Sequence, residues 1–560
     1  FWLRGKRAVE AGRTEAPHAW VIPADQRRPI AAAQLVNLLQ RQGIEVHVAE
    51  EELAWGGDAA MADDTTGGGE AGAADDTTGG GDAGAGGEES ASGPPTSGGS
   101  AAPGAYVIRS DQPYRNLVQI LLGEQKFPED AAAPYDDTGW TLPYLHGVEA
   151  HAVDDPAILE AALRRLERPI VLAGGLENPG SPIYLLHNST DDQVAVLRFR
   201  LADVQMEAAE RAFEAGGHEY GAGSFLIPAQ GNPPDLAARL DAAATELGLM
   251  VRGVATRPDV PTHALEPPRV ALVHTWVSTP QDAGWWTLVF DRIGIPYTYL
   301  SEQDLRTDDL SRFDVVILPN HGASPQTLVQ GTTDAGPPIP WQRSEVTPSL
   351  GAIDETTDTR RGMGYEGLIH LRGFLEHGGV LITEGEAAAF PIEMALTRRV
   401  EVEEADDLAA RGTVLRTVLA DTASPIAYGY PDSFASYFDQ EPVLDVDEDV
   451  GSSAVPDWLK DETWQKEVPR TVIEFAETDV LMSGMLRGED AIAGTPAVVD
   501  VPVGEGHVVL FATHPFWRLE TTGSHGLVFN TLLHWNDLRT GWPERPEEDE
   551  EAVAQDSGAF

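Results

Sequence analysis

The sequence contains no cysteine, and lysine is nearly absent: its 560 residues include only Lys6, Lys126, Lys460 and Lys466. Without a thiol the chain can form no disulfide, no thiolate zinc site and no cysteine nucleophile. Whether the protein works in a reducing or an oxidising compartment stays open, because only cysteines would indicate it. The sequence also lacks a run of about twenty apolar residues, so we expect no membrane insertion.

Acidic residues outnumber basic ones by 90 to 38, which gives a formal net charge of -52. Such a charge repels nucleic acid and anionic membranes, so neither is expected as a partner. An acidic, lysine-poor surface is also typical of proteins in high salt, where screening weakens self-repulsion. A generally acidic proteome explains the same composition, so a halophilic origin is one of two interpretations.

The length predicts about three domains. We place a linker from a missing upstream domain at 1–17, because this stretch is basic, unpatterned and lacks an initiator methionine. The chain is then expected to be the downstream part of a longer protein. The remaining boundaries predict a first α/β lobe at 18–150, a second, related lobe at 151–262, a third domain at 263–541 and an acidic tail at 542–560.

Residues 56–103 are dominated by Gly, Ala, Asp, Thr and Glu, and the unit DDTTGGG occurs at Asp63 and again at Asp75. Few large apolar side chains are available to offset the ordering entropy, so this insertion is predicted to be disordered. Its aspartates could also attract calcium, but their spacing matches no calcium-loop motif.

An internal repeat links the first two lobes. The first copy has a strand at 19–22, a helix over 30–42 and a strand at 105–108, and the second has IYLL at 183–186, a helix and SFLI at 224–227. The acidic insertion then corresponds to the loop HEYGAG in the second copy. We expect either two similar α/β lobes or two halves of one sheet.

The third domain alternates short apolar runs with amphipathic helices, which predicts a flavodoxin-like or amidotransferase-like open parallel sheet with helices on both faces. Ligands bind such sheets beyond the carboxyl ends of the strands. The polar residues that follow the apolar runs are therefore the candidate site residues: His274, Asn320, His321, Glu384, Glu386, His514 and Arg518.

Three phrases resemble the region that follows the catalytic domain in bacterial proteins of the zinc carboxypeptidase (carboxypeptidase A-like) metallopeptidase family: PYDDTGWTLPYLHGVEA at 134–150, HEYGAGSFLIP at 218–228 and SPIAYGYPDSFASYFDQEPV at 424–443. The third domain resembles the class I glutamine amidotransferase-like domain found in those proteins. This resemblance implies a secreted or periplasmic protein whose partners are an upstream carboxypeptidase domain and its peptide substrate.

The same resemblance exposes two departures. The zinc-binding HxxE pair, second histidine, arginine and glutamate base of the peptidase would all precede Phe1, so zinc is expected only in that upstream domain. The amidotransferase elbow needs a cysteine, but the sequence ITEGEA places Glu384 there, and a carboxylate is a poor acyl-transfer nucleophile. His146 and Glu149 form a literal HxxE, yet their strand-like context favours an ordinary half-buried histidine over a metal site.

Three functions remain open. The first is a non-catalytic scaffold or substrate-binding region of a zinc-carboxypeptidase-like protein, with no cofactor in this chain. The second is a hydrolase that uses Glu384, His321 and His514, with Asn320, Glu386 and Arg518 as ligand-binding residues; the same groups could simply cap helices and form ion pairs. The third is a peptide- or glycan-binding module, in which a sugar or peptide groove could be lined by Trp285, Trp286, Trp341, Trp517 and Trp535, although core packing explains most of them.

Overall fold

The computed structural model describes residues 2–56, 98–128, 130–132, 134–278, 281–307, 309–333, 335–447 and 467–542. Most of the predicted disordered insertion and nearly all of the acidic tail lie outside these ranges. The chain forms two compact units: Phe1–Gln26, Val36–Gln119 and Glu149–Pro169 in the first, and Arg27–Leu35, Ile120–Val148 and Ile170–Phe560 in the second. No helix among the described residues is long and apolar enough to cross a membrane.

The first unit is built on a five-stranded antiparallel sheet with the order β6-β1-β5-β2-β7. Its elements in chain order are α1 (Trp2–Thr14), β1 (Ala19–Ile22), α2 (Pro29–Arg41), β2 (His47–Ala49), the hairpin strands β3 (Leu53–Trp55) and β4 (Gly99–Ala101), β5 (Tyr106–Arg109), α3 (Arg115–Leu122), β6 (His151–Val153), η1 (Pro156–Glu160) and β7 (Leu163–Arg165). The β4 strand lies within the range predicted to be disordered, so the ordered chain resumes earlier than the composition indicates.

Helix α1 corrects the predicted linker at 1–17. It packs so closely on the loop after β5 that a side chain on Gly12 would lie 2.1 Å from the Ser110 carbonyl oxygen. The Gly12 carbonyl oxygen lies 3.0 Å from the His18 ring nitrogen Nδ1, and Arg13 lies 3.3 Å from Asp111. The sequence pattern does not predict this helix, because it is held in place by contacts with a distant loop rather than by an apolar stripe.

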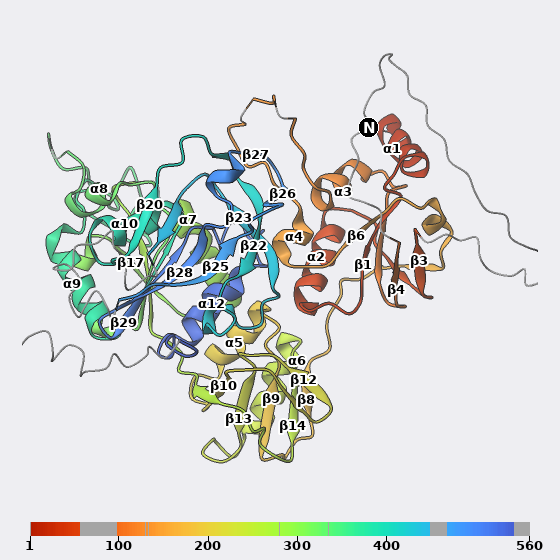
Figure 1. Cartoon of the computed structure of the whole chain (residues 1–560), viewed down its shortest axis with the longest axis horizontal. Coiled ribbons are helices and arrows are strands. Elements are labelled where there is room, and N and C mark those ends of the chain that lie inside the picture. Colours follow the sequence, from red (N-terminus) through yellow and green to blue (C-terminus); the bar gives the residue numbers. More distant parts are fainter. Residues whose placement is uncertain are drawn as a thin grey trace, which may run out of the picture. The chain divides into compact units, whose positions relative to one another are not determined.

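A second sheet, in the second unit, has the order β15-β10-β13-β9-β14-β8 (Figure 1). Its elements are β8 (Gly175–Glu177), β9 (Ile183–Leu186), α5 (Asp192–Arg200), β10 (Glu207–Ala209), the hairpin β11 (Phe213–Ala215) and β12 (His218–Tyr220), β13 (Phe225–Pro228), α6 (Leu236–Leu247), β14 (Met250–Val254) and β15 (Thr262–Ala264). Apart from the added β8, its order β14-β9-β13-β10-β15 matches β6-β1-β5-β2-β7 strand for strand. The repeat therefore forms two separate lobes, and the hairpins β3–β4 and β11–β12 occupy equivalent positions.

The lobe boundaries differ from those predicted. Strands β6 and β7 pair with β1 and β2, so residues 151–169 complete the first lobe rather than begin the second. Residues 120–148, placed in the first lobe from the sequence, belong to the second unit. Strand partners rather than sequence proximity decide these boundaries, and single short strands such as β7 carry no signal of their partner.

The third part of the chain forms a mixed ten-stranded sheet with the order β17-β16-β18-β19-β29-β28-β25-β22-β23, in which β26 also pairs with β22 (Figure 1). Five strands are parallel: β16 (Val270–His274), β17 (Thr298–Ser301), β18 (Val315–Leu318), β19 (Val380–Glu384) and β29 (Gly506–Phe511). The helices α7 (Gln281–Ile293), α8 (Pro325–Gln330), α9 (Gly364–Glu376), α10 (Ala389–Glu393) and α12 (His525–Leu533) connect or follow these strands. The predicted mixture of helices and parallel strands is present.

The sheet is not wholly parallel, which corrects the predicted open parallel sheet. The strands β22 (Thr413–Leu419), β23 (Ser433–Phe438), β25 (Arg470–Phe475), β26 (Leu481–Ser483) and β28 (Pro496–Val503) extend it with antiparallel pairs. Strands β22 and β23 lie at one end of the sheet, beyond β25. Smaller pairs join β20 (Val400–Glu403) to β24 (Val443–Val446) and β21 (Ala409–Ala410) to β27 (Leu486–Arg487).

The phrase at 134–150 packs onto β23 and the loop after β29. Asp137 has a side chain that is 8 % exposed, and its carboxylate accepts a hydrogen bond from the Tyr437 hydroxyl at 2.7 Å, from Trp517 Nε1 at 3.3 Å and from Arg518 Nη1 at 2.5 Å. The short helix α4 (Leu142–His146) follows and contacts β23. Two of the phrases quoted above are thus joined at one carboxylate, although Asp137 and Tyr437 are 300 residues apart.

Replacing Asp137 with Ala should lower the free energy of unfolding by about 2–3 kcal/mol, because a charged hydrogen-bond acceptor with three donors is removed. Chemical denaturation followed by tryptophan fluorescence measures this, since Trp517 is one of the donors. Asp136→Ala is the matched control: the neighbouring carboxylate is 46 % exposed and should be nearly neutral. Equal effects of the two substitutions would contradict the account.

Candidate functional site

Ionisable side chains form a row along the carboxyl edge of the five parallel strands. The strand order places Glu302 after β17, His274 at the end of β16, His321 after β18, Glu384 at the end of β19 and His514 after β29. The site predicted from the ends of apolar runs is therefore one continuous edge of the sheet. Open α/β sheets bind ligands at this edge.

A buried acid and imidazole cluster occupies the centre of the edge. Glu384 is fully buried, and its Oε2 accepts a hydrogen bond from Trp286 Nε1 at 2.5 Å. His514 Nδ1 lies 3.5 Å from Asp282 Oδ2 and 3.9 Å from Glu384 Oε1. The sequence analysis missed Asp282; the only available signal is its place in the first turn of the helix after β16.

Burial and mutual charge set the protonation of this cluster. Burial raises the pKa of Glu384 to about 8, and the charge of Asp282 acts in the same direction. Burial opposes a charge on His514, but the Asp282 carboxylate beside the ring outweighs burial and raises the pKa of His514. Near pH 7 the cluster therefore holds a protonated Glu384 and an imidazolium at His514, and neither group is a general base.

The sharp turn after β19 is made by Gly385, which corrects the prediction that Glu384 takes the nucleophile's place. Glu384 has an extended backbone with φ of -134°, whereas Gly385 has φ of 55°. A side chain on Gly385 would begin 2.7 Å from His514 Cε1 and 3.2 Å from Asn320 Cγ. The imidazole therefore fills the space that a nucleophile at the elbow would need.

His321 borders this cluster but is electrostatically different. Its Nδ1 accepts a hydrogen bond from the Ala323 N–H at 3.0 Å, and burial lowers its pKa to about 4, so the ring is neutral. His321 Nε2 and Asn320 Oδ1 are buried without a hydrogen-bond partner among the described residues, as are Asp282 Oδ2, Glu384 Oε1 and His514 Nδ1. Groups of this kind usually bind water or a polar ligand in native proteins.

The two remaining predicted ligand residues do not join the cluster. Arg518 pairs with Asp136 and Asp137 instead of reaching Glu384. Glu386 is exposed, and its Oε2 lies 4.0 Å from the position of a side chain on Gly322. We find no polar contact from Glu386 to Glu384 or His514 among the described residues.

Aromatic rings surround the other end of the edge. His274 stacks on Tyr299 with centroids 4.6 Å apart, and Trp276 lies 4.7 Å from His274 and 6.0 Å from Trp341. Asp354 Oδ2 lies 2.8 Å from His274 Nε2. Asp354 and Trp341 come from the insertion between α8 and α9, so their place at this edge has no signal in the strand pattern.

Glu302 completes this end of the edge. It is fully buried, and its carboxylate accepts hydrogen bonds from the Trp276 N–H at 2.8 Å and the Val277 N–H at 3.2 Å. Burial raises its pKa to about 8. Glu302 therefore holds the loop after β16 in place and has little capacity left for a ligand.

The structure does not bring His146 and Glu149 into one site. His146 is buried at the end of α4, and burial lowers its pKa to about 3. The Glu149 side chain is 60 % exposed, and its Oε1 lies 2.9 Å from His151 Nε2. Throughout the described ranges, no three His, Asp or Glu side chains are arranged to hold a metal ion.

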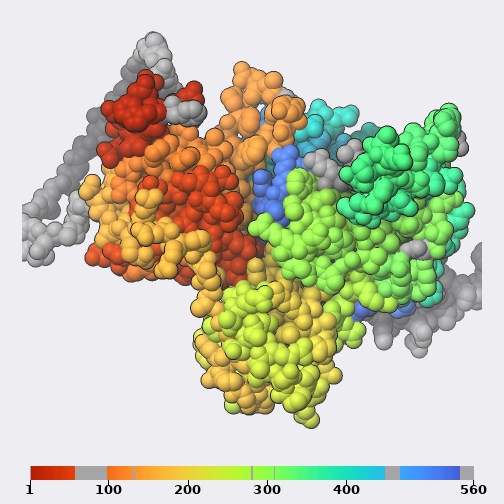
Figure 2. Space-filling model, turned by 180° about the vertical axis from the view of Figure 1, so that it is seen from behind, coloured from red at the N-terminus to blue at the C-terminus, as the bar shows by residue number. Residues whose placement is uncertain are grey.

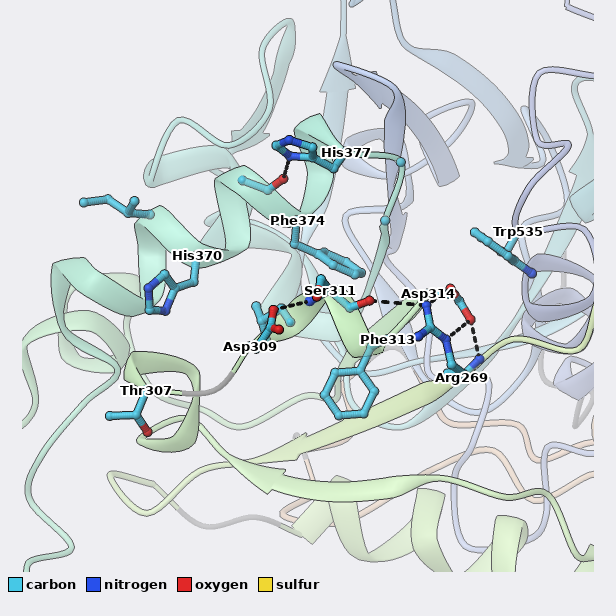
Figure 3. A pocket seen from close by; sticks show the side chains of 15 residues that line it. Arg269, Thr307, Asp309, Ser311, Phe313, Asp314, His370, Phe374, His377 and Trp535 are labelled. Atoms are coloured by element: carbon cyan, nitrogen blue, oxygen red, sulfur yellow. Dashed lines mark hydrogen bonds and ion pairs between the residues drawn. The ribbon is translucent and has the colours of Figure 1, made fainter.

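A cavity of about 710 Å³ lies at the opposite, amino edge of the sheet (Figure 3). Arg269 and Asp314, which precede β16 and β18, form an ion pair of 2.7 Å at its wall, and Phe374 and Trp535 add apolar surface. None of the predicted site residues lines it. Because open α/β sheets bind ligands at the other edge, this cavity is separate from the candidate site.

No protein-family model matches the sequence, and no curated protein matches it either. The solved structures that resemble it include a β-galactosidase from Bacillus circulans sp. alkalophilus, at 15 % identity and a TM-score of 0.27 over 52 % of this chain and 34 % of that chain. PurLQS from Thermotoga maritima has 14 % identity and a TM-score of 0.28 over 48 % of this chain and 99 % of that chain.

A protein from Bacteroides uniformis described as thua-like has 9 % identity and a TM-score of 0.27, over 49 % of this chain and 92 % of that chain. The chain spans about a third of the β-galactosidase. At these TM-scores the matches carry no argument, so the fold rests on the strand order given above. None of the three proteins is a carboxypeptidase, and that resemblance stays a prediction.

Replacing Gly385 with Ala should lower the free energy of unfolding by about 1–3 kcal/mol, because the methyl group would contact His514 and the backbone is left-handed. Thermal denaturation measures the effect. Gly373→Ala, inside α9 with open space around it, is the control and should be neutral or slightly stabilising. A Gly385→Ala variant as stable as wild type would show that the elbow has room for a side chain.

The raised pKa of Glu384 predicts a pH-dependent difference between wild type and Glu384→Gln. A folded-state pKa of about 8, against 4.5 in the unfolded chain, gives stability that is complete below about pH 4.5 and lost as the pH rises through 8. The amide does not titrate, so wild type should lose stability relative to the variant across this window. Urea denaturation at pH 5 and pH 8 tests it, and a constant difference would mean that Glu384 is ionised throughout.

Proposed function

We propose that this chain is a non-catalytic accessory region that scaffolds or binds peptide for a peptidase domain of the zinc carboxypeptidase family. The observation that carries the non-catalytic part is the elbow, where Gly385 has no side chain and His514 fills the space beside it. Acyl transfer at such an elbow requires a side-chain nucleophile. The peptidase partner and the secreted location follow only from the resemblance of the three phrases.

The contact at Asp137 supports the use of the whole region as one scaffold. The carboxylate joins the segment 134–147 to Tyr437 and Trp517, and the Tyr437 ring stacks on Trp517 with centroids 5.3 Å apart. Trp517 and Tyr437 in turn each lie 5.9 Å from the His514 ring. Side chains from two separate segments, both bound by Asp137, thus cover one side of His514, which favours stability over access by a substrate.

A hydrolase that uses Glu384, His321 and His514 is less well supported. Near neutral pH, Glu384 and His514 are protonated, and His321 already accepts a backbone hydrogen bond at Nδ1. The other ring nitrogen of His321, Nε2, therefore carries the proton and is not available as a base. A hydrolytic site would need at least one unprotonated base directed at a water molecule.

A peptide- or glycan-binding role of the same chain is favoured by one further observation. The Trp341 ring is 42 % exposed and lies beside Trp276 at the carboxyl edge, and Trp341 pairs through its backbone with Thr356. An exposed, well-supported indole provides a flat apolar surface with a polar edge. This role is compatible with an accessory region and differs from it only in needing no peptidase partner.

The purified chain should hydrolyse neither glutamine nor C-terminal peptide bonds, with or without added Zn²⁺, because Gly385 offers no nucleophile at the elbow and His514 fills the space beside it. Product release by wild type, Glu384→Gln and His514→Asn should equal the buffer blank. Turnover that Glu384→Gln abolishes would establish the hydrolase instead. The coding sequence upstream of Phe1 tests the partner separately: an HxxE pair followed by a distant histidine is expected there.

A further inference from the structure

A second cavity, of about 850 Å³, lies between the end of α8 and the beginning of α9. Its wall includes Arg306, Arg360 and Arg361, together with Asp358 and Glu366. The segments on either side of the cavity belong to the insertion between β18 and β19, which lies on the surface and is drawn in green in Figure 2. Nothing in the candidate site described above includes these residues.

Closely packed backbone forms the floor of this cavity. A side chain on Gly331 would lie 2.2 Å from the Arg360 carbonyl oxygen, and one on Gly362 would lie 2.4 Å from the Leu328 carbonyl oxygen. The Thr332 N–H donates to the Arg360 carbonyl at 2.8 Å, and the Met363 N–H donates to the Leu328 carbonyl at 2.9 Å. These contacts fix the two segments against each other, so the cavity is part of the folded insertion.

Gln303 binds the insertion to the sheet. Its side-chain amide, just after β17, donates to the carbonyl oxygens of Asp358 at 3.0 Å and Arg361 at 2.9 Å, and its Oε1 accepts from the Thr356 hydroxyl at 2.8 Å. The backbone that carries Arg360 and Arg361 is therefore held by a side chain from the sheet. A pre-formed position of this kind lowers the ordering cost of binding.

The three arginines differ in their existing partners. Arg360 forms two hydrogen bonds of 2.8 Å with Asp358, whose pKa is held far below its usual range by this contact. Arg306 Nη2 lies 3.5 Å from Glu366 Oε2, in an exposed and weak pair. Arg361 is exposed and makes no ion pair with the residues that the structure describes. Its guanidinium is free to bind a ligand.

The charge balance of the wall is unusual for this protein. Among the wall residues that the structure describes, three guanidiniums face two carboxylates, an excess of one positive charge in a chain with a formal net charge of -52. The negative field of the whole chain repels anions from most of the surface. A locally positive cavity is therefore a place where an anion can still bind. One excess charge matches a singly charged carboxylate better than a doubly charged phosphate.

We propose that this cavity binds a carboxylate-bearing ligand, with Arg361 as the principal contact and Arg306 as a second donor. Planar guanidinium groups pair with carboxylates through two parallel hydrogen bonds, which gives orientation as well as affinity. Tyr365, whose ring is 63 % exposed and whose hydroxyl accepts from Gln330 Nε2 at 3.3 Å, supplies apolar surface beside the charge. A peptide with a free C-terminus fits this combination; the peptide source rests on the proposed function, whereas carboxylate binding does not.

Isothermal titration of the full chain tests the proposal with N-acetyl-Ala-Ala, which has a free carboxylate, with its C-terminal amide and with inorganic phosphate. We expect the free acid to bind, the amide to bind at least tenfold more weakly, and phosphate to bind more weakly than the acid. Arg361→Gln should weaken acid binding about tenfold, which corresponds to loss of one charged hydrogen bond. Arg306→Gln should have a smaller effect in the same direction.

Arg211→Gln is the matched control, because Arg211 is also exposed and the substitution changes the net charge equally. It should leave binding unchanged, and thermal midpoints of all three variants should equal wild type. Equal affinity for acid and amide, tighter binding of phosphate, or an Arg361→Gln variant that binds like wild type would each overturn the proposal. The titration measures binding only, so its failure is distinct from the appearance of hydrolase activity, which would contradict the proposed function.

Discussion

The packing of the His514 ring against Gly385 is the constraint on which the functional account depends. At the centre of the parallel strands, the turn after β19 has the left-handed backbone of an elbow but presents no side chain. The imidazole occupies the adjacent space, 2.7 Å from where a side chain would begin. The Asp282 carboxylate then stabilises the charged imidazole, and burial keeps Glu384 protonated.

The contacts that stabilise this cluster also occupy the groups that could otherwise react with a substrate. Trp286, which is fully buried, donates to Glu384, and Tyr437 and Trp517 lie over His514. Tyr437 and Trp517 are themselves held by Asp137, from a segment about three hundred residues away in the sequence. A buried polar network of this kind fixes one arrangement of side chains and holds Glu384 and His514 in their protonated forms, in which neither acts as a base.

The sequence predicts part of this well. Polar residues after apolar runs indicated the carboxyl edge, because parallel strands end at the same side of a sheet. The repeat of strand, helix and strand allowed either two lobes or two halves of one sheet, and the structure has two lobes with matching strand order. The residues that contact this edge could not be predicted from the sequence. Asp282 lies in a helix that carries no motif, and Asp137 contacts Tyr437 only in the folded chain. The linker prediction for the residues of α1 was wrong because contacts with the distant loop after β5 hold this helix in place.

The accessory role and the carboxylate cavity use different parts of the same architecture. The first concerns the closed centre of the carboxyl edge, and the second concerns the insertion between α8 and α9, which Gln303 connects to the sheet. A sheet that keeps its carboxyl edge while a side chain fills the nucleophile position can still bind a ligand without catalysing a reaction.

The protonation state of His514 tests the central claim most directly. Nuclear magnetic resonance of ¹⁵N-histidine-labelled protein, with the signal assigned by comparison with His514→Gln, reports the charge on both ring nitrogens. The account predicts an imidazolium with both nitrogens protonated from pH 6 to pH 8, and titration only near pH 9. A neutral ring at pH 7 would contradict it, because a free base would then stand at the centre of the edge.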